Sequence, residues 1–310
     1  MKPVVLILNT LDESKRAPIE ARYTVVYAAT PAERAEAIAS RGAEIDALMT
    51  IGTVGLTAAE IDAMPRLSLV CTLGVGYERV DTAHARQRGI ALANGAGTNA
   101  DVVADQAFAL MLAAVRKLPV YDRAAREGID RDHLPTLPQV AHKRLGIMGL
   151  GAIGNKIAQR GRGFDMEVGY FSRNRRDDAP HAYFGSLAEL AAWCDVLVVA
   201  APGGAATHHA VDADILRALG RHGYLVNISR GSVVDTEALA AALRAGDIAG
   251  AGLDVYESEP APPLPLVDLD NLVLSPHIGG RSPEAIQNTI DRFLANAEGH
   301  FSGRGVVSPI

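Results

Sequence analysis

Short apolar runs alternate with polar, helix-favouring segments along the first third of the chain. The runs are Val4–Leu8, Tyr23–Tyr27, Ala47–Ile51 and Leu67–Leu73, and segments such as Pro31–Ser40 separate them. A continuous apolar strand followed by a helix is typical of a parallel sheet that is buried on both faces. The pattern therefore predicts an α/β domain over this part of the chain.

A long helix is predicted over Asn99–Leu118. Apolar residues recur at helical spacing along it, Asp101 lies in its first turn, and Pro119 is expected to end it. The next segment, Val120–His142, is rich in charge and proline and has weak periodicity. It is either a linker or an arm that packs on another subunit. The arm is considered because a connection of this length usually has a function.

A second series of strands and helices begins at Lys143. The expected strands are Leu145–Met148, Val168–Phe171, Val196–Ala200, Tyr224–Ile228, Ala249–Asp254 and Leu272–Leu274, and the expected helices between them are Ile153–Gly161, Leu187–Ala192, Ala213–Leu219 and Thr236–Arg244. A last helix is expected to begin at Ser282 and Pro283, because serine is a good N-cap and proline suits the first helical position. Two such series in 310 residues predict two domains.

Composition excludes several classes of protein. Hydrophobic residues make up 48% of the chain and charged residues 21%, which is enough apolar material for a large core. The net charge is −6 and no basic tract is present, so a nucleic-acid partner is not expected. The longest uncharged run, between Asp195 and Asp212, is interrupted by Pro202, Gly203 and Gly204. No membrane-spanning segment is therefore expected.

The cysteines and the N-terminus indicate a cytoplasmic protein. Cys71 and Cys194 lie far apart and form no CxxC pair, as is usual in a reducing compartment. The apolar run Val4–Leu8 soon meets Asp12 and Glu13 and has no small-residue cleavage site, which favours a buried strand over a signal peptide.

A glycine-rich turn lies between an expected strand and an expected helix. Its residues are Gly149, Leu150, Gly151, Ala152, Ile153 and Gly154. In a GxGxxG turn the first glycine permits the tight bend, the second lets the backbone approach a pyrophosphate, and the third lets helix and strand pack closely. The helix N-terminus also offers unpaired N–H groups to the anion. The sequence therefore favours a dinucleotide site here over a glycine-rich turn that holds no ligand.

Basic residues follow the next strand, where an acid is usual in NAD-binding domains. They are Arg173, Arg175 and Arg176, with Ser172 before them, and no acid occurs until Asp177. A carboxylate at this point would hold the ribose 2′-hydroxyl of NAD and repel a 2′-phosphate, whereas serine and arginine bind a phosphate. NADP(H) is therefore the preferred cofactor and NAD(H) the alternative. A solvated basic loop is the other interpretation of the same residues.

Three polar patches each follow an expected strand. They are Asn227–Gly231, Gly252–Pro260 and Ser275–Gly280. Ligands of open α/β sheets bind outside the carboxyl ends of the strands, so all three patches are expected to converge on the nicotinamide.

With these motifs the chain resembles the D-isomer-specific 2-hydroxyacid dehydrogenase family over nearly its whole length. The matching elements, in order, are Gly74–Tyr77, the turn Gly149–Gly154 and the three polar patches. The Ser-Arg-Asn-Arg-Arg stretch at 172–176 further resembles the NADP-dependent glyoxylate/hydroxypyruvate reductase and hydroxyphenylpyruvate reductase branch. This resemblance implies two Rossmann-like doubly wound parallel-sheet domains with an active-site cleft between them. Residues 1–99 plus 282–310 would form a discontinuous substrate-binding domain, residues 100–281 would form the dinucleotide-binding domain, and the protein would be a homodimer.

The family pattern also implies three catalytic residues. Arg230 would hold the carboxylate and the carbonyl oxygen of a 2-oxo acid. His277 would protonate that oxygen as hydride arrives, and Glu259 would pair with His277 and raise its pKa. The chemistry agrees, because an arginine stabilises developing oxyanion charge, histidine titrates near neutral pH, and an acidic partner favours the imidazolium.

Further contacts follow from the same pattern. Val75 and Gly76 would bind the substrate carboxylate through their N–H groups, with Gly280 and Arg281 completing the substrate site. Arg281 would either add a second positive group or only cap the last helix. The cofactor would meet Pro202, Thr207, Ile228, Arg230, Asp254 and His277.

The predicted reaction is NADPH-dependent reduction of a small 2-oxo acid, such as glyoxylate or hydroxypyruvate, to the D-2-hydroxy acid. The alternatives are an NAD-dependent member such as phosphoglycerate dehydrogenase, or a non-catalytic dinucleotide-sensing scaffold. No metal is expected. His208 and His209 are adjacent, so on a regular element they would point apart, and no third ligand follows at a suitable spacing.

Overall fold

The computed structural model describes residues 2–310 and divides into two compact units. The first unit contains the residues up to Asn99 together with Arg281–Ile310, and the second unit is Ala100–Gly280. The domain boundaries expected from the sequence were 99/100 and 281/282, so the second boundary differs by one residue. No helix within residues 2–310 is both long and apolar enough to cross a membrane.

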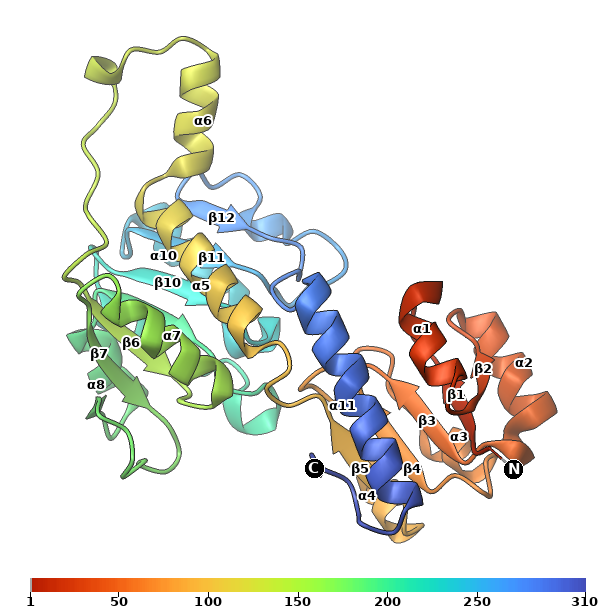
Figure 1. The fold of residues 1–310 in the computed structure, drawn as a ribbon. Coiled ribbons are helices and arrows are strands. Elements are labelled where there is room, and N and C mark those ends of the chain that lie inside the picture. The colour runs from red at the N-terminus through yellow and green to blue at the C-terminus, as the bar shows by residue number, and fades with distance from the viewer. Residues whose placement is uncertain (1) are drawn as a thin grey trace. The chain divides into compact units, whose positions relative to one another are not determined.

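The first unit is built on a parallel sheet of five strands in the order β2-β1-β3-β4-β5 (Figure 1). Its strands are β1 (Val4–Ile7), β2 (Thr24–Tyr27), β3 (Ala47–Thr50), β4 (Leu69–Thr72) and β5 (Ala91–Asn94), and its helices are α1 (Glu13–Glu20), α2 (Pro31–Arg41), α3 (Ala58–Asp62), α4 (Thr82–Gln87) and α11 (Pro283–Phe301). This strand order is one of the two common doubly wound arrangements.

The second unit is built on a parallel sheet of seven strands in the order β12-β11-β10-β9-β6-β7-β8. Its strands are β6 (Arg144–Met148), β7 (Glu167–Phe171), β8 (Ala182–Tyr183), β9 (Val196–Val199), β10 (Tyr224–Asn227), β11 (Gly250–Leu253) and β12 (Leu272–Leu274), and its helices are α5 (Ala100–Val115), α6 (Leu118–Arg126), α7 (Ala152–Arg162), α8 (Leu187–Trp193), α9 (Ala213–Leu219) and α10 (Thr236–Ala245). The order reverses between β6 and β9, as in a Rossmann sheet, and confirms the predicted fold class.

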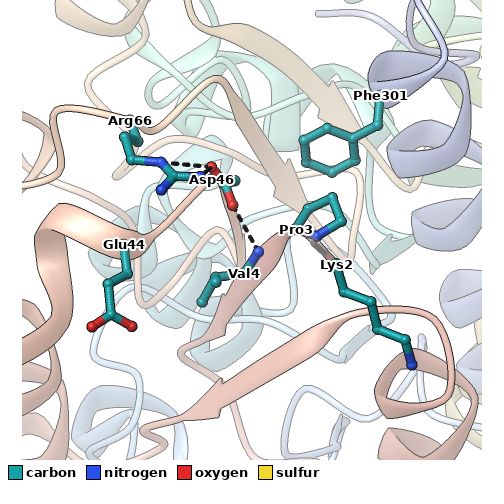
Figure 2. Close-up of a pocket in the computed structure, with 7 residues that line it drawn as sticks. All are labelled: Lys2, Pro3, Val4, Glu44, Asp46, Arg66 and Phe301. Carbon is teal, nitrogen blue, oxygen red and sulfur yellow. Dashed lines mark hydrogen bonds and ion pairs between the residues drawn. The ribbon is translucent and has the colours of Figure 1, made fainter.

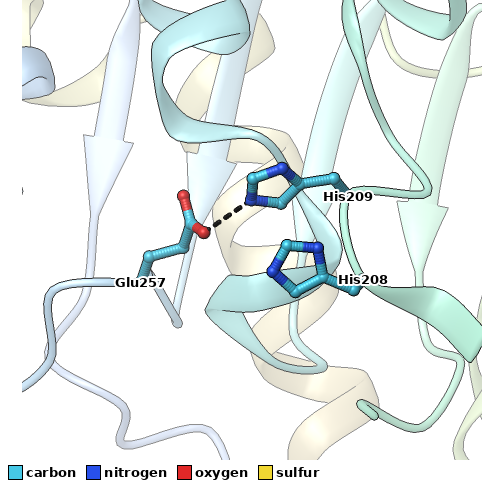
Figure 3. Close-up of side chains that lie close together, drawn as sticks. All are labelled: His208, His209 and Glu257. Atoms are coloured by element: carbon cyan, nitrogen blue, oxygen red, sulfur yellow. Dashed lines mark hydrogen bonds and ion pairs between the residues drawn. The ribbon is translucent and has the colours of Figure 1, made fainter. Parts of the chain in front are cut away.

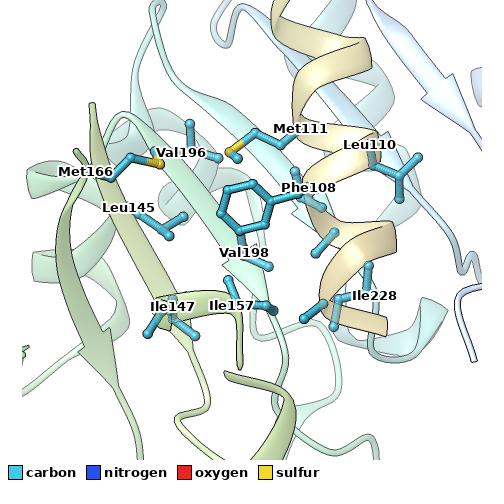
Figure 4. Packing of buried hydrophobic residues seen from close by; sticks show 14 of the residues in the cluster. Phe108, Leu110, Met111, Leu145, Ile147, Ile157, Met166, Val196, Val198 and Ile228 are labelled. Carbon is cyan, nitrogen blue, oxygen red and sulfur yellow. The ribbon is translucent and has the colours of Figure 1, made fainter. Parts of the chain in front are cut away.

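Alternate residues of each strand feed opposite cores, because side chains of a strand point to opposite faces. In β6, Leu145 and Ile147 pack with Phe108 of α5 and Ile157 of α7 (Figure 4). The next residue, Met148, packs on the other face with the cluster that α8, α9 and α10 cover. The five-stranded sheet is covered in the same way, with α2, α3 and α4 on one face and α1 and α11 on the other.

The structure corrects the expected course of the chain after the long helix. Helix α5 ends at Val115, and Lys117 adopts a left-handed backbone with φ of 47°. Pro119 then lies in the first turn of α6 rather than at the end of α5, because proline has no N–H to lose there. Most of α6 and the chain that follows it project away from the sheet of the second unit (Figure 1).

Besides α6, two strands and three shorter helices were not predicted from the sequence. Strand β5 reads Ala-Leu-Ala-Asn, which is poor in the branched and aromatic residues that mark strands, and β8 has two residues. Helices α1, α3 and α4 have only five to eight residues each. Elements this short carry little periodic pattern.

The C-terminal tail closes the edge of the five-stranded sheet. Ser308 accepts a hydrogen bond from the Asn94 N–H at 3.1 Å, and Pro309 forms an antiparallel bridge with Ala93. The tail is held by Asn296 of α11, which is 1% exposed and whose Oδ1 accepts from the N–H groups of Val307 and Ser308 at 2.9 and 3.0 Å. One buried amide therefore joins the last helix to the last strand of this sheet.

Replacing Asn296 by alanine is expected to destabilise the first unit by about 2–4 kcal/mol, because two backbone N–H groups lose their acceptor. Urea-induced unfolding measures the loss. The control is Asn288→Ala on the exposed face of the same helix, which is expected to change the free energy of unfolding by less than about 1 kcal/mol. Equal losses for the two variants would contradict this role of Asn296.

Candidate active site

The glycine turn after β6 has the shape that a dinucleotide requires. Gly149 has φ of 99°, and a Cβ on it would lie 2.7 Å from the Ala201 backbone. A Cβ on Gly154 would overlap the Gly149 carbonyl oxygen, whereas a Cβ on Gly151 would meet nothing within 4 Å. Gly151 is also the N-cap of α7 and offers no side-chain cap. The turn therefore leaves an open approach to the uncapped N-terminus of a helix, which suits a pyrophosphate.

The basic loop after β7 divides into structural and exposed residues. Arg176 forms an ion pair with Asp178 at 2.7 Å and donates to the Leu150 carbonyl at 3.0 Å, so it ties this loop to the glycine turn. The Ser172 hydroxyl donates to the Asn174 carbonyl at 2.7 Å. Of the three arginines in this loop, Arg173 and Arg175 are exposed, whereas Arg176 is half-buried.

The loop after β9 places a glycine against Arg230. The Thr207 hydroxyl donates to the Pro202 carbonyl at 2.7 Å and closes this loop as a short 3₁₀ turn, Ala205–Thr207. A Cβ on Gly203 would lie 2.6 Å from Cγ of Arg230. The glycine therefore lets the loop backbone lie directly on the arginine side chain. No local pattern in the sequence predicts this contact between Gly203 and Arg230.

Arg230 follows β10 in a turn that Asn227 holds. The Asn227 side chain accepts from the Ser229 N–H at 3.1 Å and donates to the Arg230 carbonyl at 3.0 Å. The Arg230 guanidinium donates to the Ser229 carbonyl at 2.7 Å. Ile228, which was expected to line the cofactor site, is buried and packs in the core beneath α5 and α7. Its contact with the cofactor stays a prediction.

His277 and Glu259 form a hydrogen-bonded pair. His277 Nδ1 lies 2.7 Å from Glu259 Oε2, and the other carboxylate oxygen accepts from the Tyr256 N–H at 2.8 Å. The hydrogen bond to Glu259, together with the negative charges of Glu259 and Asp254, raises the pKa of His277, and burial and the Arg230 charge offset this only in part. Burial acts to raise the pKa of Glu259, but its hydrogen bonds and the nearby positive charges outweigh this and lower it. The pair therefore favours an imidazolium beside a carboxylate.

Asp254 holds the turn that carries His277. This carboxylate is 3% exposed, and its Oδ1 accepts from the Ser275 hydroxyl at 2.6 Å and the Ile278 N–H at 3.1 Å. Its Oδ2 accepts from the Gly279 N–H at 2.8 Å. The His277 N–H donates to the Asp254 carbonyl at 2.8 Å, and His277 has a left-handed φ of 54°. The expected contact of Asp254 with the nicotinamide stays a prediction, and its hydrogen bonds to this turn were not predicted from the sequence.

Gln106 of α5 extends this network. Its Nε2 donates to the Ser275 hydroxyl at 2.8 Å, and Ser275 in turn donates to Asp254. The amide therefore supports the His277 turn from a helix about 170 residues earlier in the chain. No sequence pattern predicts this role of Gln106, because it is the packing of α5 against β11 and β12 that places the side chain beside Ser275.

The predicted substrate residues Val75 and Gly76 lie in the loop after β4 of the first unit. Asn94 donates from its side chain to the Val75 carbonyl at 3.0 Å, and the Gly95 N–H donates to the Gly74 carbonyl at 2.9 Å. Val75 is exposed and Gly76 is buried. The loop is thus fixed by the residues that end β5, and the tail at Ser308 fixes those in turn.

The remaining predicted substrate residues are Gly280 and Arg281, at the point in the sequence where the second unit ends. Gly280 is the last residue of the second unit and Arg281, which is exposed, is the first residue of the returning part of the first unit. Ser282 caps α11 by accepting from the Ala285 N–H at 3.1 Å. Ser282, and not Arg281, therefore forms the cap. The substrate roles of Gly280 and Arg281 stay predictions.

A pocket in the first unit is unrelated to these loops (Figure 2). It lies beside Val4, at the amino end of β1, whereas Val75 and Gly76 follow the carboxyl end of β4. Asp46 in this pocket forms an ion pair with Arg66 at 2.7 Å and accepts from the Val4 N–H at 2.8 Å. Its charged groups are already matched within the chain.

The geometrical reason given against a metal at His208 and His209 is wrong. His209 has a left-handed φ of 49°, so the two rings do not point apart but stack with centroids 4.0 Å apart (Figure 3). Glu257 supplies a third group, and ligand atoms of the three residues all lie within 4.8 Å of one another. The expectation assumed a regular element, and this segment is irregular.

Comparison with known proteins decides the family. The model of the D-isomer specific 2-hydroxyacid dehydrogenase NAD binding domain matches residues 108–279. The chain belongs to the D-isomer-specific 2-hydroxyacid dehydrogenase family. It is therefore an oxidoreductase that acts on CH–OH donors, with a nicotinamide dinucleotide as cofactor.

Relatives of this dehydrogenase match it over nearly its whole length. It is 37% identical to hydroxyphenylpyruvate reductase of Plectranthus scutellarioides, covering 99% of this chain and 98% of that protein. It is 35% identical to 2-ketogluconate reductase of Gluconobacter oxydans, covering 100% and 99%. A solved NADPH-dependent glyoxylate/hydroxypyruvate reductase of Sinorhizobium meliloti, in complex with NADP and malonate, superposes with a TM-score of 0.91 at 33% identity, covering 100% and 97%.

Replacing Gln106 by leucine is expected to lower kcat/KM of the dehydrogenase about tenfold, because the His277 turn loses a support worth roughly 1–2 kcal/mol. Ser275→Ala is expected to have a similar effect, and the double variant to lose less than the sum, since both act through Asp254. Steady-state kinetics of the three variants measure this. Fully additive losses, or losses matched by Gln139→Leu on an exposed loop, would contradict the network.

Proposed function

We propose that this protein catalyses NADPH-dependent reduction of a small 2-oxo acid to the D-2-hydroxy acid. The observation that carries the proposal is the 2.7 Å pair of His277 and Glu259, with Arg230 close enough for its charge to act on both pKa values. These residues follow strands β10, β11 and β12, whose carboxyl ends meet at one edge of the dinucleotide-type sheet.

Arg230, His277 and Glu259 have different roles in the reaction. When bound, NADPH supplies a hydride to carbon 2 of the substrate. Arg230 binds the carboxylate and the carbonyl oxygen and stabilises the negative charge that develops on that oxygen. With Nδ1 held by Glu259, His277 keeps Nε2 as its second donor and protonates the oxygen from there. The carbonyl becomes a hydroxyl, and His277 is left neutral until it regains a proton from solvent.

Arg173 and Arg175 support the preference for NADPH over NADH. Both are exposed after β7, next to a glycine turn that suits the pyrophosphate. Their positive charges would bind a 2′-phosphate through charge-assisted hydrogen bonds. Arg176 instead ties this loop to the glycine turn, because its guanidinium already pairs with Asp178 and with the Leu150 carbonyl.

The substrate class rests on the family and on the charges of the site. The relatives are named for hydroxyphenylpyruvate, 2-ketogluconate, glyoxylate and hydroxypyruvate, which share a 2-oxo acid. On the first unit, the N–H groups of Val75 and Gly76 would bind the substrate carboxylate. Arg281, with Gly280 beside it, would add a positive group for an acid or a polyhydroxylated chain.

A homodimer is also proposed, with the projecting segment around α6 as part of the interface. Leu118 is 54% exposed and Ile129 is 43% exposed on this segment. Large apolar side chains exposed on a projecting arm favour burial against a second copy of the chain.

The proposal is tested by following the loss of NADPH absorbance with glyoxylate, hydroxypyruvate, phenylpyruvate and 2-ketogluconate, and by repeating each assay with NADH. We expect turnover with NADPH well above NADH. His277→Ala is expected to abolish turnover while NADPH still binds. Replacing both Arg173 and Arg175 by alanine is expected to raise KM for NADPH about tenfold and to leave KM for NADH nearly unchanged.

The matched control is Arg221→Ala, an exposed arginine of the second unit between α9 and β10. Equal or better turnover with NADH in the unaltered protein would overturn the 2′-phosphate argument and favour an NAD-dependent member such as a phosphoglycerate dehydrogenase. No turnover with any acid, despite NADPH binding, would overturn this substrate class.

The pair of His277 and Glu259 also predicts how the rate depends on pH. The pKa of His277 is raised, so its proton is fully present at lower pH and the reductive kcat/KM falls as pH rises through that raised pKa. Glu259→Gln removes the cause of the shift and is expected to move this fall to lower pH. Rate profiles of the unaltered protein, Glu259→Gln and the exposed control Glu167→Gln measure it. An unmoved profile in Glu259→Gln would show that another group titrates.

A further inference from the structure

Three side chains with metal-binding atoms meet outside the catalytic residues. His208 and His209 follow the 3₁₀ turn Ala205–Thr207 after β9, and Glu257 follows β11. Figure 3 shows the ring of His209 facing the Glu257 carboxylate, with the ring of His208 beside it. One nitrogen from each histidine and a carboxylate oxygen lie within 4.8 Å of one another.

The backbone of each loop holds these side chains in place. The His209 N–H donates to the Ser232 carbonyl at 2.8 Å, and φ of 49° at His209 returns its ring to the side of His208. Glu257 Oε2 accepts from the Thr236 N–H at 3.1 Å, at the start of α10. The other oxygen, Oε1, is thereby directed to His209 Nε2, 2.7 Å away.

A second carboxylate lies behind His209. Asp235 Oδ2 is 3.7 Å from His209 Nδ1, on the side of the ring opposite to Glu257. In metal sites a ligating histidine usually has a carboxylate or carbonyl at its second nitrogen, which fixes the ring and increases its basicity. Asp235 also caps α10 by accepting from the Ala238 N–H at 3.0 Å, so its position is set by the fold.

We propose that His208, His209 and Glu257 form a binding site for a divalent transition-metal ion of the zinc type. Two imidazole nitrogens and one carboxylate oxygen are a donor set that Zn²⁺ accepts, with the remaining position left to water. Mg²⁺ and Ca²⁺ require oxygen donors throughout, so the two histidines exclude them as preferred ions. The proton that Nε2 of His209 and Oε1 of Glu257 now share leaves to solvent when the cation takes its place.

Such an ion would join two loops that the proposed function uses. Thr207 precedes His208 directly, and Glu259 lies two residues after Glu257. The metal site does not depend on the proposed function, because none of its three ligands is assigned to the substrate or to the catalytic acid.

The test is a titration of the full-length, tag-free protein with ZnCl₂ by calorimetry, and with CoCl₂ by visible absorption. We expect one ion per chain and the absorption bands of a nitrogen- and oxygen-coordinated Co²⁺. His208→Ala is the decisive variant. It removes one ligand from an exposed position and leaves the hydrogen bond between His209 and Glu257 intact. Its affinity for Zn²⁺ is expected to fall at least about tenfold.

Two further variants make the test specific. Asp235→Asn keeps a good helix cap but removes the charge behind His209, so we expect an affinity loss of about tenfold. His222→Ala, at another exposed histidine of the same unit, is expected to bind Zn²⁺ like the unaltered protein. Absence of Zn²⁺ binding to the unaltered protein, or equal binding by His208→Ala and His222→Ala, would overturn the proposal.

Discussion

The buried carboxylate of Asp254 is the constraint on which the catalytic turn depends. A charge that is only 3% exposed is costly unless donors surround it, and here the donors are the backbone of residues 278 and 279 and the Ser275 hydroxyl. Because all these donors must point at the Asp254 carboxylate, the chain after β12 is held in one bent conformation. His277 lies inside that bend with a left-handed backbone, and its ring is delivered to Glu259. The hydrogen-bond donors that the buried Asp254 carboxylate requires therefore also fix the position of His277.

Parallel topology supplies the larger frame for this arrangement. Strands β9, β10, β11 and β12 are neighbours in the sheet and all run in the same direction, so the segments that leave them start from one edge. Glycines then let the segments approach closely. Gly203 accommodates the Arg230 side chain, and a Cβ on Gly231 would overlap the backbone of Tyr256. The loops that carry Arg230, Glu257 and Glu259 approach one another closely because the glycines at these contacts have no side chain.

The sequence predicted the features that depend on local pattern. Both α/β series, the glycine turn at 149–154 and the polar ends of the strands follow from apolar runs and from short motifs, and the structure has the expected fold class. The features that it missed depend on distant parts of the chain. Strand β5 is weak in strand-forming residues and is completed by the tail at Ser308, and Gln106 matters only because α5 packs beside Ser275. No spacing rule connects residues so far apart in sequence.

Backbone conformation explains why the two histidine sites were judged differently from the sequence. His277 was recognised through the motif around it, whereas His208 and His209 were set aside because adjacent residues on a regular element diverge. Both His277 and His209 have positive φ, which a side chain other than glycine adopts only at a cost of about 1–3 kcal/mol. In each case the ring that this conformation places is bound by a glutamate of the loop after β11. Lys117, Asp165 and His142 also have positive φ, but the first two lie in connections next to helix ends and His142 lies in the connection before β6, so strain alone does not mark a site. What distinguishes the two histidines is the carboxylate that meets each ring.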